Sequence, residues 1–131
     1  MQSIQEEMEK VIEVDGKPVK FRATAAIPRL YRIKFKRDIL LDMQSIQEAL
    51  EKSQRGEGSI PVFLLEIFEN AAYIMARHAN PDLPEHSVEE WLDTFETFSI
   101  YELFPKIFEL WIDNLYSMSD AKKNAGQAPV K

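Results

Sequence analysis

The side chains that could do chemistry are few and poorly placed for it. Two histidines, His78 and His86, lie eight positions apart across a proline-rich stretch, and the chain has no cysteine. A zinc site needs three or four such ligands, so the sequence predicts no metal site. The adjacent Glu89 and Glu90 suit a helix start better than acid–base catalysis, because no motif holds two carboxylates over a substrate. GxSxG, Walker A and GxGxxG motifs are also missing. We therefore expect no catalytic residue, no cofactor and no enzymatic activity.

Basic and acidic residues gather in different segments. Residues 16–37 contain eight Lys or Arg and no acidic residue, whereas residues 82–113 contain nine acidic residues and one Lys. The two segments could neutralise each other within one fold or attract copies of the chain head to tail. Arg29, Arg32 and Lys36 lie at i, i+3 and i+7, which places them on one helix face as a candidate basic patch. Because the net charge is −6, we expect no nucleic-acid partner, and a DNA-binding regulator is kept as an alternative.

A β-hairpin is predicted near the amino terminus. Residues 11–14 and 17–23 have the composition of short strands, and Asp15-Gly16 between them favours a type I′ turn. This turn fixes a register that gathers four side chains on one apolar face: Ile12, Val14, Val19 and Phe21. A lone hairpin is marginal in water, so this face must pack on helices or on the strands of another chain.

The residues after Thr24 change to a helical period. Apolar side chains recur at spacings of three and four at Tyr31, Phe35, Ile39, Met43, Ile46 and Leu50. The pattern predicts helix to about Lys52, with a break near Asp42. A loop rich in Gly and Ser is expected at residues 53–59.

Three further helices are predicted in the second half of the chain. Residues 61–79 form a strong helical pattern that ends at a proline-rich stretch. Ser87 and Ser99 are each followed three residues later by Glu, the capping-box spacing that begins a helix. We expect the last helix to end near Tyr116, with an irregular turn or kink at Pro105.

These elements define the expected fold class. The chain has 131 residues, of which 45% are hydrophobic, enough for one domain with a sizeable core. No apolar run is long enough to span a membrane. We predict an α+β fold, mostly α, in which a short N-terminal β-hairpin precedes a bundle of about four to five helices. Residues 1–116 form the single domain, and residues 117–131 are expected to be a disordered tail.

Two of the predicted helices carry more apolar surface than one monomer readily buries. Residues 61–79 and residues 99–116 are apolar around most of their circumference, whereas a surface helix needs an apolar arc of about a third. One helix of this kind can be central in a bundle, but a second suggests an interface with a partner. The candidate contact residues for a partner or a second copy are Leu64, Phe68, Phe104, Phe108, Trp111 and, on the hairpin, Phe21.

Five segments together carry a resemblance to a known family: residues 21–32 (FRATAAIPRLYR), 35–39 (FKRDI), 68–76 (FENAAYIMA), 89–93 (EEWLD) and 98–102 (FSIYE). They resemble the tail assembly chaperones of long-tailed phages and prophages of Gram-positive bacteria. The resemblance covers roughly residues 11–116, and its motifs are structural rather than catalytic.

The resemblance implies a non-catalytic role in virion assembly. Such chaperones are thought to coat the helical tape measure protein and to recruit major tail tube protein around it. The implied partners are therefore these two proteins and further copies of the chain, in the host bacterial cytoplasm and not in the mature virion. A generic protein-interaction or adaptor domain is the alternative.

The family resemblance also implies a possible second product. In that family a minority of ribosomes shift frame near the end of the gene and append a further domain. Lys122-Lys123-Asn124 is compatible with an A-rich slippery heptamer, although synonymous codons could equally remove it. The codons of the gene decide between the two.

Overall fold

The chain enters its fold through a β-hairpin. The computed structural model describes the backbone of residues 8–127 and the side chains of residues 8–113 and 115. Strand β1 (Glu9–Val14) pairs antiparallel with β2 (Lys17–Arg22), and Ile12 lies opposite Val19, as the sequence predicts. The two residues of the Asp15-Gly16 turn have φ angles of 55° and 75°. Both angles are positive, as a type I′ turn requires.

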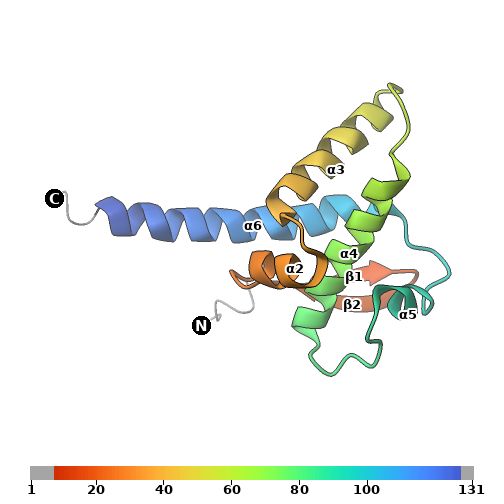
Figure 1. Ribbon diagram of the computed structural model, residues 1–131, viewed down its shortest axis with the longest axis horizontal. Helices are drawn as coiled ribbons and strands as arrows, with labels where there is room; N and C mark the ends of the chain where they lie inside the picture. The colour runs from red at the N-terminus through yellow and green to blue at the C-terminus, as the bar shows by residue number, and fades with distance from the viewer. Residues whose placement is uncertain (1–7, 128–131) are drawn as a thin grey trace.

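Five helices follow the hairpin in the described part of the chain (Figure 1). This order confirms the predicted fold class, an α+β fold that is mostly α. The helices are α2 (Ile27–Phe35), α3 (Ile39–Gln54), α4 (Val62–Ala79), α5 (Val88–Leu92) and α6 (Ile100–Gln127).

Helix α4 is the central element of the fold. It contacts β2 and each of the other four helices, and six consecutive residues from Ala71 to Ala76 are buried. A helix in this position needs apolar side chains on all sides, which accounts for the wide apolar arc of its sequence.

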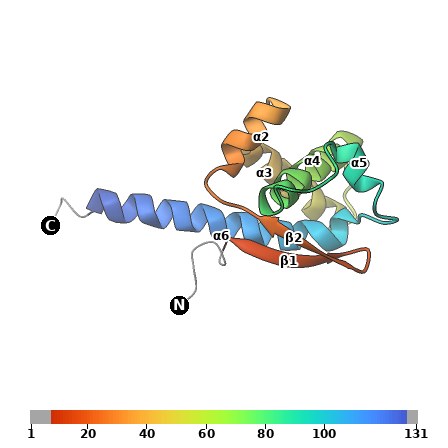
Figure 2. The same ribbon diagram turned by 90° about the horizontal axis from the view of Figure 1, so that it is seen from below.

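The apolar face of the hairpin packs on helices of the same chain. Ile12, Val14 and Phe21 are buried, with β2 against α4 and β1 against α6. The Phe21 ring meets Trp91 of α5 edge to face, with 6.3 Å between ring centroids. In Figure 2 the hairpin and α6 run side by side, with the other helices above them. The hairpin and α4 therefore cover much of the apolar surface of α6.

The break between α2 and α3 comes earlier than the sequence predicts. We expected it near Asp42, but α2 ends at Phe35 and α3 begins at Ile39. Lys36 adopts a left-handed conformation with φ of 59°, and the Asp38 carboxylate accepts a hydrogen bond from the Leu40 amide at 2.9 Å. Asp38 is thus an N-cap, and it starts a new helix there.

Helix α6 continues past its expected end. Its backbone is helical to Gln127 rather than to about Tyr116, and it includes Pro105. Residues 117–125, expected as part of a disordered tail, contain neither Gly nor Pro and include Ala and Lys, which favour helix. Such a segment extends an existing helix without a nucleation cost. Residues 128–131 of the expected tail lie outside the described residues.

Candidate interaction surface

The contact residues proposed from the sequence lie mainly in the core. Five are buried and Phe108 is half-buried. Phe104 links several of them, because its ring centroid lies 5.8 Å from that of Phe68 and 5.1 Å from that of Phe108. The five buried residues belong to the core and do not form a surface that a partner could reach. The buried five are Phe21, Leu64, Phe68, Phe104 and Trp111.

A different set of large apolar side chains is exposed. Ile33 of α2 is 55% exposed and Val62 of α4 is 70% exposed. The remaining members of the set are Val11, Leu30, Leu40, Leu41, Phe63 and Tyr101. The sequence analysis missed Leu30 and Ile33. The available signal was that both fall outside the stripe formed by Tyr31 and Phe35, whose spacing marks the inner face of α2.

The predicted basic patch lies on the outer face of the same helix. Arg29 and Arg32 of α2 are exposed, and so is Lys36 at its carboxyl-terminal cap. The amphipathic pattern of α2 explains this arrangement, because the buried Ile27 and Tyr31 face inward. Basic and exposed apolar side chains therefore share one face of one short helix.

The basic and acidic segments do not neutralise each other through ion pairs among the described side chains. Lys10, outside the basic segment, reaches Glu109 of α6 at 3.4 Å. Lys17 donates to the Thr94 carbonyl at 2.6 Å, and the Asp15 carboxylate accepts from the Glu96 amide at 2.9 Å. Charged residues of the hairpin thus bond to backbone groups of residues 94–96 and form no ion pairs there, and the charges of α2 are left facing outward.

A buried polar network fixes α2 against α3. Tyr31 donates to Asp42 Oδ2 at 2.7 Å, and Arg37 donates to both carboxylate oxygens of Asp42 at 2.8 Å. Asp42 is 5% exposed. Burial, reinforced by the hydrogen bond to the Asp42 carboxylate, raises the pKa of the Tyr31 hydroxyl, which therefore stays protonated and donates. This network sets the position of the exposed face of α2.

A groove runs between α2 and the carboxyl-terminal end of α4. Its volume is about 410 Å³, within the range of about 300–1,000 Å³ that is usual for ligand pockets. Its walls combine apolar and cationic side chains: Leu30, Ile33, Ile74 and Pro81 with Lys34 and Arg77.

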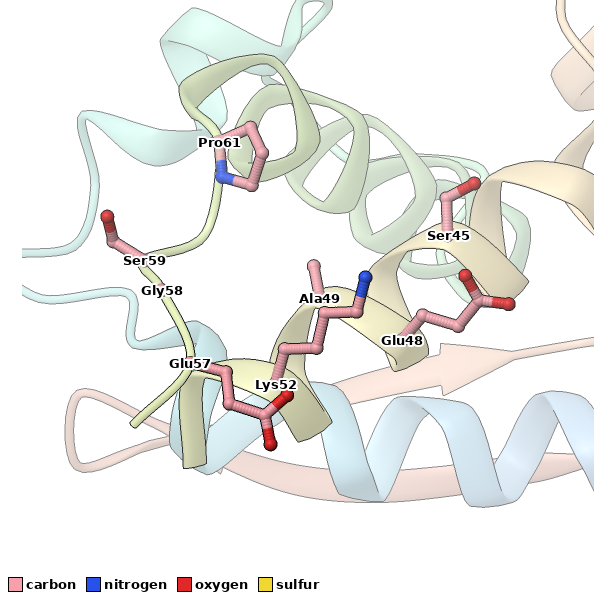
Figure 3. Close-up of a pocket in the computed structure, with 8 residues that line it drawn as sticks. All are labelled: Ser45, Glu48, Ala49, Lys52, Glu57, Gly58, Ser59 and Pro61. Carbon is pink, nitrogen blue, oxygen red and sulfur yellow. The ribbon is translucent and has the colours of Figure 1, made fainter. Parts of the chain in front are cut away.

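A second depression lies at the far end of α3 and has no clear chemistry. Figure 3 shows Ala49 and Lys52 of α3 pointing into the open space, with the loop from Glu57 to Pro61 as the opposite wall. Glu57 is already paired with Arg55, at 2.6 Å between Nε and Oε2. The lining contains no histidine or cysteine to activate its serines.

Both histidines have local structural partners. His78 Nε2 and Thr24 Oγ1 are hydrogen-bonded at 2.7 Å, and burial, with help from the charge of Arg22, lowers the pKa of His78. His86 Nδ1 lies 3.5 Å from Arg77 Nη2. Across the described residues, no three His, Asp or Glu side chains are grouped to hold a metal ion. None of the described helices is both long and apolar enough to cross a membrane.

Comparison of the chain with protein-family models, curated proteins and solved structures finds no match. The interpretation of its function therefore depends on its own residues, on the geometry of the exposed face of α2 and on the resemblance carried by the sequence.

Proposed function

We propose that this chain is a non-catalytic phage tail assembly chaperone. It binds the tape measure protein and helps to recruit major tail tube protein during tail morphogenesis, in the cytoplasm of the host bacterium. It associates with further copies of itself and is not retained in the mature virion. In the family that the chain resembles, an amino-terminal hairpin precedes a mostly helical body, and the chain has the same order of elements.

One observation carries the proposal: a chain with a well-packed core exposes large apolar side chains on its helices. A protein that binds an apolar helical client needs such side chains on its surface, supported by a core that does not rearrange. Ile33 and Leu30 on α2 meet this requirement, because the Tyr31–Asp42 bond holds the helix beneath them. This surface takes the place of the buried residues that the sequence analysis favoured.

Co-expression with the longest helical protein encoded just downstream tests the proposal. We expect the two proteins to co-purify and the client to stay in the supernatant after lysis. A client that remains insoluble and a pull-down that recovers no complex would overturn the chaperone proposal. Expression of the client alone is the control for its own solubility.

DNA binding is the second candidate function, and the basic face of α2 is the observation that favours it. Arg29 and Arg32 are exposed and make no ion pair with the described side chains. A gel-shift assay with random duplex DNA at low salt tests this alternative, because phosphate contacts are strongest there. A shift at micromolar protein would support a DNA-binding regulator, and no shift would remove it.

A generic adaptor domain would bind a protein other than the tape measure protein.

A further inference from the structure

The outer face of α2 combines two features that are unfavourable in the isolated chain. Leu30 and Ile33 expose apolar surface at 37% and 55%. Around them are four basic residues that make no ion pair with any described side chain: Arg29, Arg32, Lys34 and Lys36. Like charges three or four residues apart destabilise a helix by about 0.2–0.5 kcal/mol per pair. A partner that supplies both apolar cover and negative charge would relieve both features.

The groove beside this face is cationic, and its charges have no carboxylate partner among the described side chains. Arg77 donates to the carbonyl oxygens of Leu83 at 3.1 Å and Glu85 at 3.0 Å, which are neutral acceptors. The Lys34 ammonium lies 5.9 Å from the ring centroid of Tyr73, over its face. Neither cation forms an ion pair with a described carboxylate. The groove therefore presents two positive charges beside an apolar floor.

We propose that the groove between α2 and the end of α4 binds an amphipathic helix of another protein, one whose apolar face is flanked by Glu or Asp. The apolar side chains of such a helix would enter between Ile33 and Ile74, and its carboxylates would pair with Lys34 and Arg77. Apolar residues at the centre of the face are unsuited to the phosphate backbone of a nucleic acid, which is charged along its whole length.

The acidic segment of the chain itself, residues 82–113, is a poor match for this ligand. Glu102 and Glu109 of α6 are exposed, but the apolar residues beside them, including Leu103 and Leu110, are buried in the core. In α5, Glu89 and Glu90 are exposed while its buried apolar residues face inward. Tyr101, at 49%, is the one exposed large apolar side chain in residues 82–113. This acidic segment therefore offers carboxylates with little apolar surface, and charge complementarity together with apolar contact favours a different protein.

The inference goes beyond the proposed function, because it names the chemistry of the bound segment and not its source. A synthetic peptide can therefore test it without the phage client. The probe is a fluorescein-labelled peptide of about 18 residues, or about five helical turns, with leucines along one face and glutamates on both flanks. The matched control peptide has glutamine in place of each glutamate.

Fluorescence anisotropy with the full chain gives the affinity of each peptide. We expect the glutamate peptide to bind at least about tenfold more tightly than the glutamine peptide. Its affinity should fall as salt is raised, because exposed charges are then screened. Equal binding of the two peptides, or binding of neither, would overturn the proposal.

Four single substitutions locate the binding surface. Ile33→Ser and Lys34→Glu should each weaken binding about tenfold, since each removes one half of the recognition. The matched controls are Val62→Ser, another exposed apolar residue, and Lys52→Glu, another exposed lysine. These controls should bind as the unchanged chain does, and thermal melts should show that all four variants are folded.

Three other results would contradict the proposal. Equal loss of binding in the control variants would place the contact elsewhere. The chain could bind random duplex DNA and no peptide. Loss of that DNA binding in Lys34→Glu would assign the face to nucleic acid. Self-association that increases with protein concentration and is lost in Ile33→Ser, together with no peptide binding, would assign the face to a second copy.

Discussion

At the scale of single residues, a three-residue polar network determines where the exposed face of α2 lies. The buried Asp42 of α3 accepts hydrogen bonds from Tyr31 and Arg37. Tyr31 lies in α2, and Arg37 follows the end of that helix. A buried carboxylate is unfavourable unless it is paired and hydrogen-bonded, and here both oxygens have partners. The network therefore ties α2 to α3 with a defined geometry.

A double-mutant cycle on Asp42 and Tyr31 measures this coupling. Asp42→Ala leaves the Tyr31 hydroxyl buried without an acceptor, so we expect a loss of about 1–3 kcal/mol in the free energy of unfolding. Tyr31→Phe combined with Asp42→Ala should cost less than the sum of the two single changes. Urea denaturation of the four proteins gives the coupling energy. Additive effects would show that the hydrogen bond does not contribute to stability.

His78 predicts a specific pH dependence of stability. Burial lowers its pKa in the folded protein below the ordinary value of 6.5. As the pH is lowered below 6.5, the unfolded chain therefore binds a proton that the folded chain does not. The free energy of unfolding decreases as the pH is lowered. Above pH 6.5 His78 is neutral in both states, and its contribution is fully present.

Thermal melts from pH 7 to pH 5 test this with His78→Gln as the comparison, because glutamine does not titrate and can still hydrogen-bond to Thr24. From pH 7 to pH 5 the melting temperature of the unchanged chain should fall further than that of the variant. Parallel losses in the two proteins would show that His78 does not titrate on unfolding in this range.

At the scale of elements, the hairpin is stabilised from one side only. Phe21 on the inner face is fully buried, whereas Val11 on the outer face of the neighbouring strand is 61% exposed. Phe21→Asp should lower the free energy of unfolding by about 2–4 kcal/mol, because it places a charge among apolar side chains. Val11→Asp is the matched control and should stay within about 0.5 kcal/mol of the unchanged chain. Equal melting temperatures for the two variants would contradict this packing.

Helix α6 predicts a separation between helix content and stability. Its carboxyl-terminal half projects beyond the other elements (Figures 1 and 2). Deletion of residues 117–131 should therefore reduce the helical circular dichroism signal while leaving the melting temperature nearly unchanged, because helical stability in proteins comes mainly from packing. A clear fall in melting temperature would show that this segment packs on the body of the protein.

The sequence predicts elements that depend on local rules better than surfaces that depend on packing. The Asp15-Gly16 turn determines the hairpin register because both residues must have positive φ. The break at Asp38 was misplaced because Ile39 continues the apolar spacing across it, while the cap is a single side-chain hydrogen bond. The spacing of Phe68 and Phe104 suggests contact residues, because it does not reveal that α4 and α6 pack on each other and that both pack on the hairpin.

At the scale of the whole molecule, charge and apolar exposure coincide on one side of the fold. The basic segment contributes the outward face of α2, and its charges are not neutralised by the acidic residues of α5 and α6 through described ion pairs. A molecule built in this way steers an acidic partner toward the apolar residues that then hold it. We therefore place the central interaction of the protein on α2 and the end of α4.

Hydrogen exchange on the complex with the downstream-encoded helical client tests this placement most directly. Short surface helices open locally more readily than core elements, so a bound partner should slow hydrogen exchange in the nine-residue α2 measurably. We predict slower exchange in residues 27–36 and 74–81 of the complex than in the free chain. No complex with the client, or protection confined to residues 88–113 with α2 unchanged, would contradict the account.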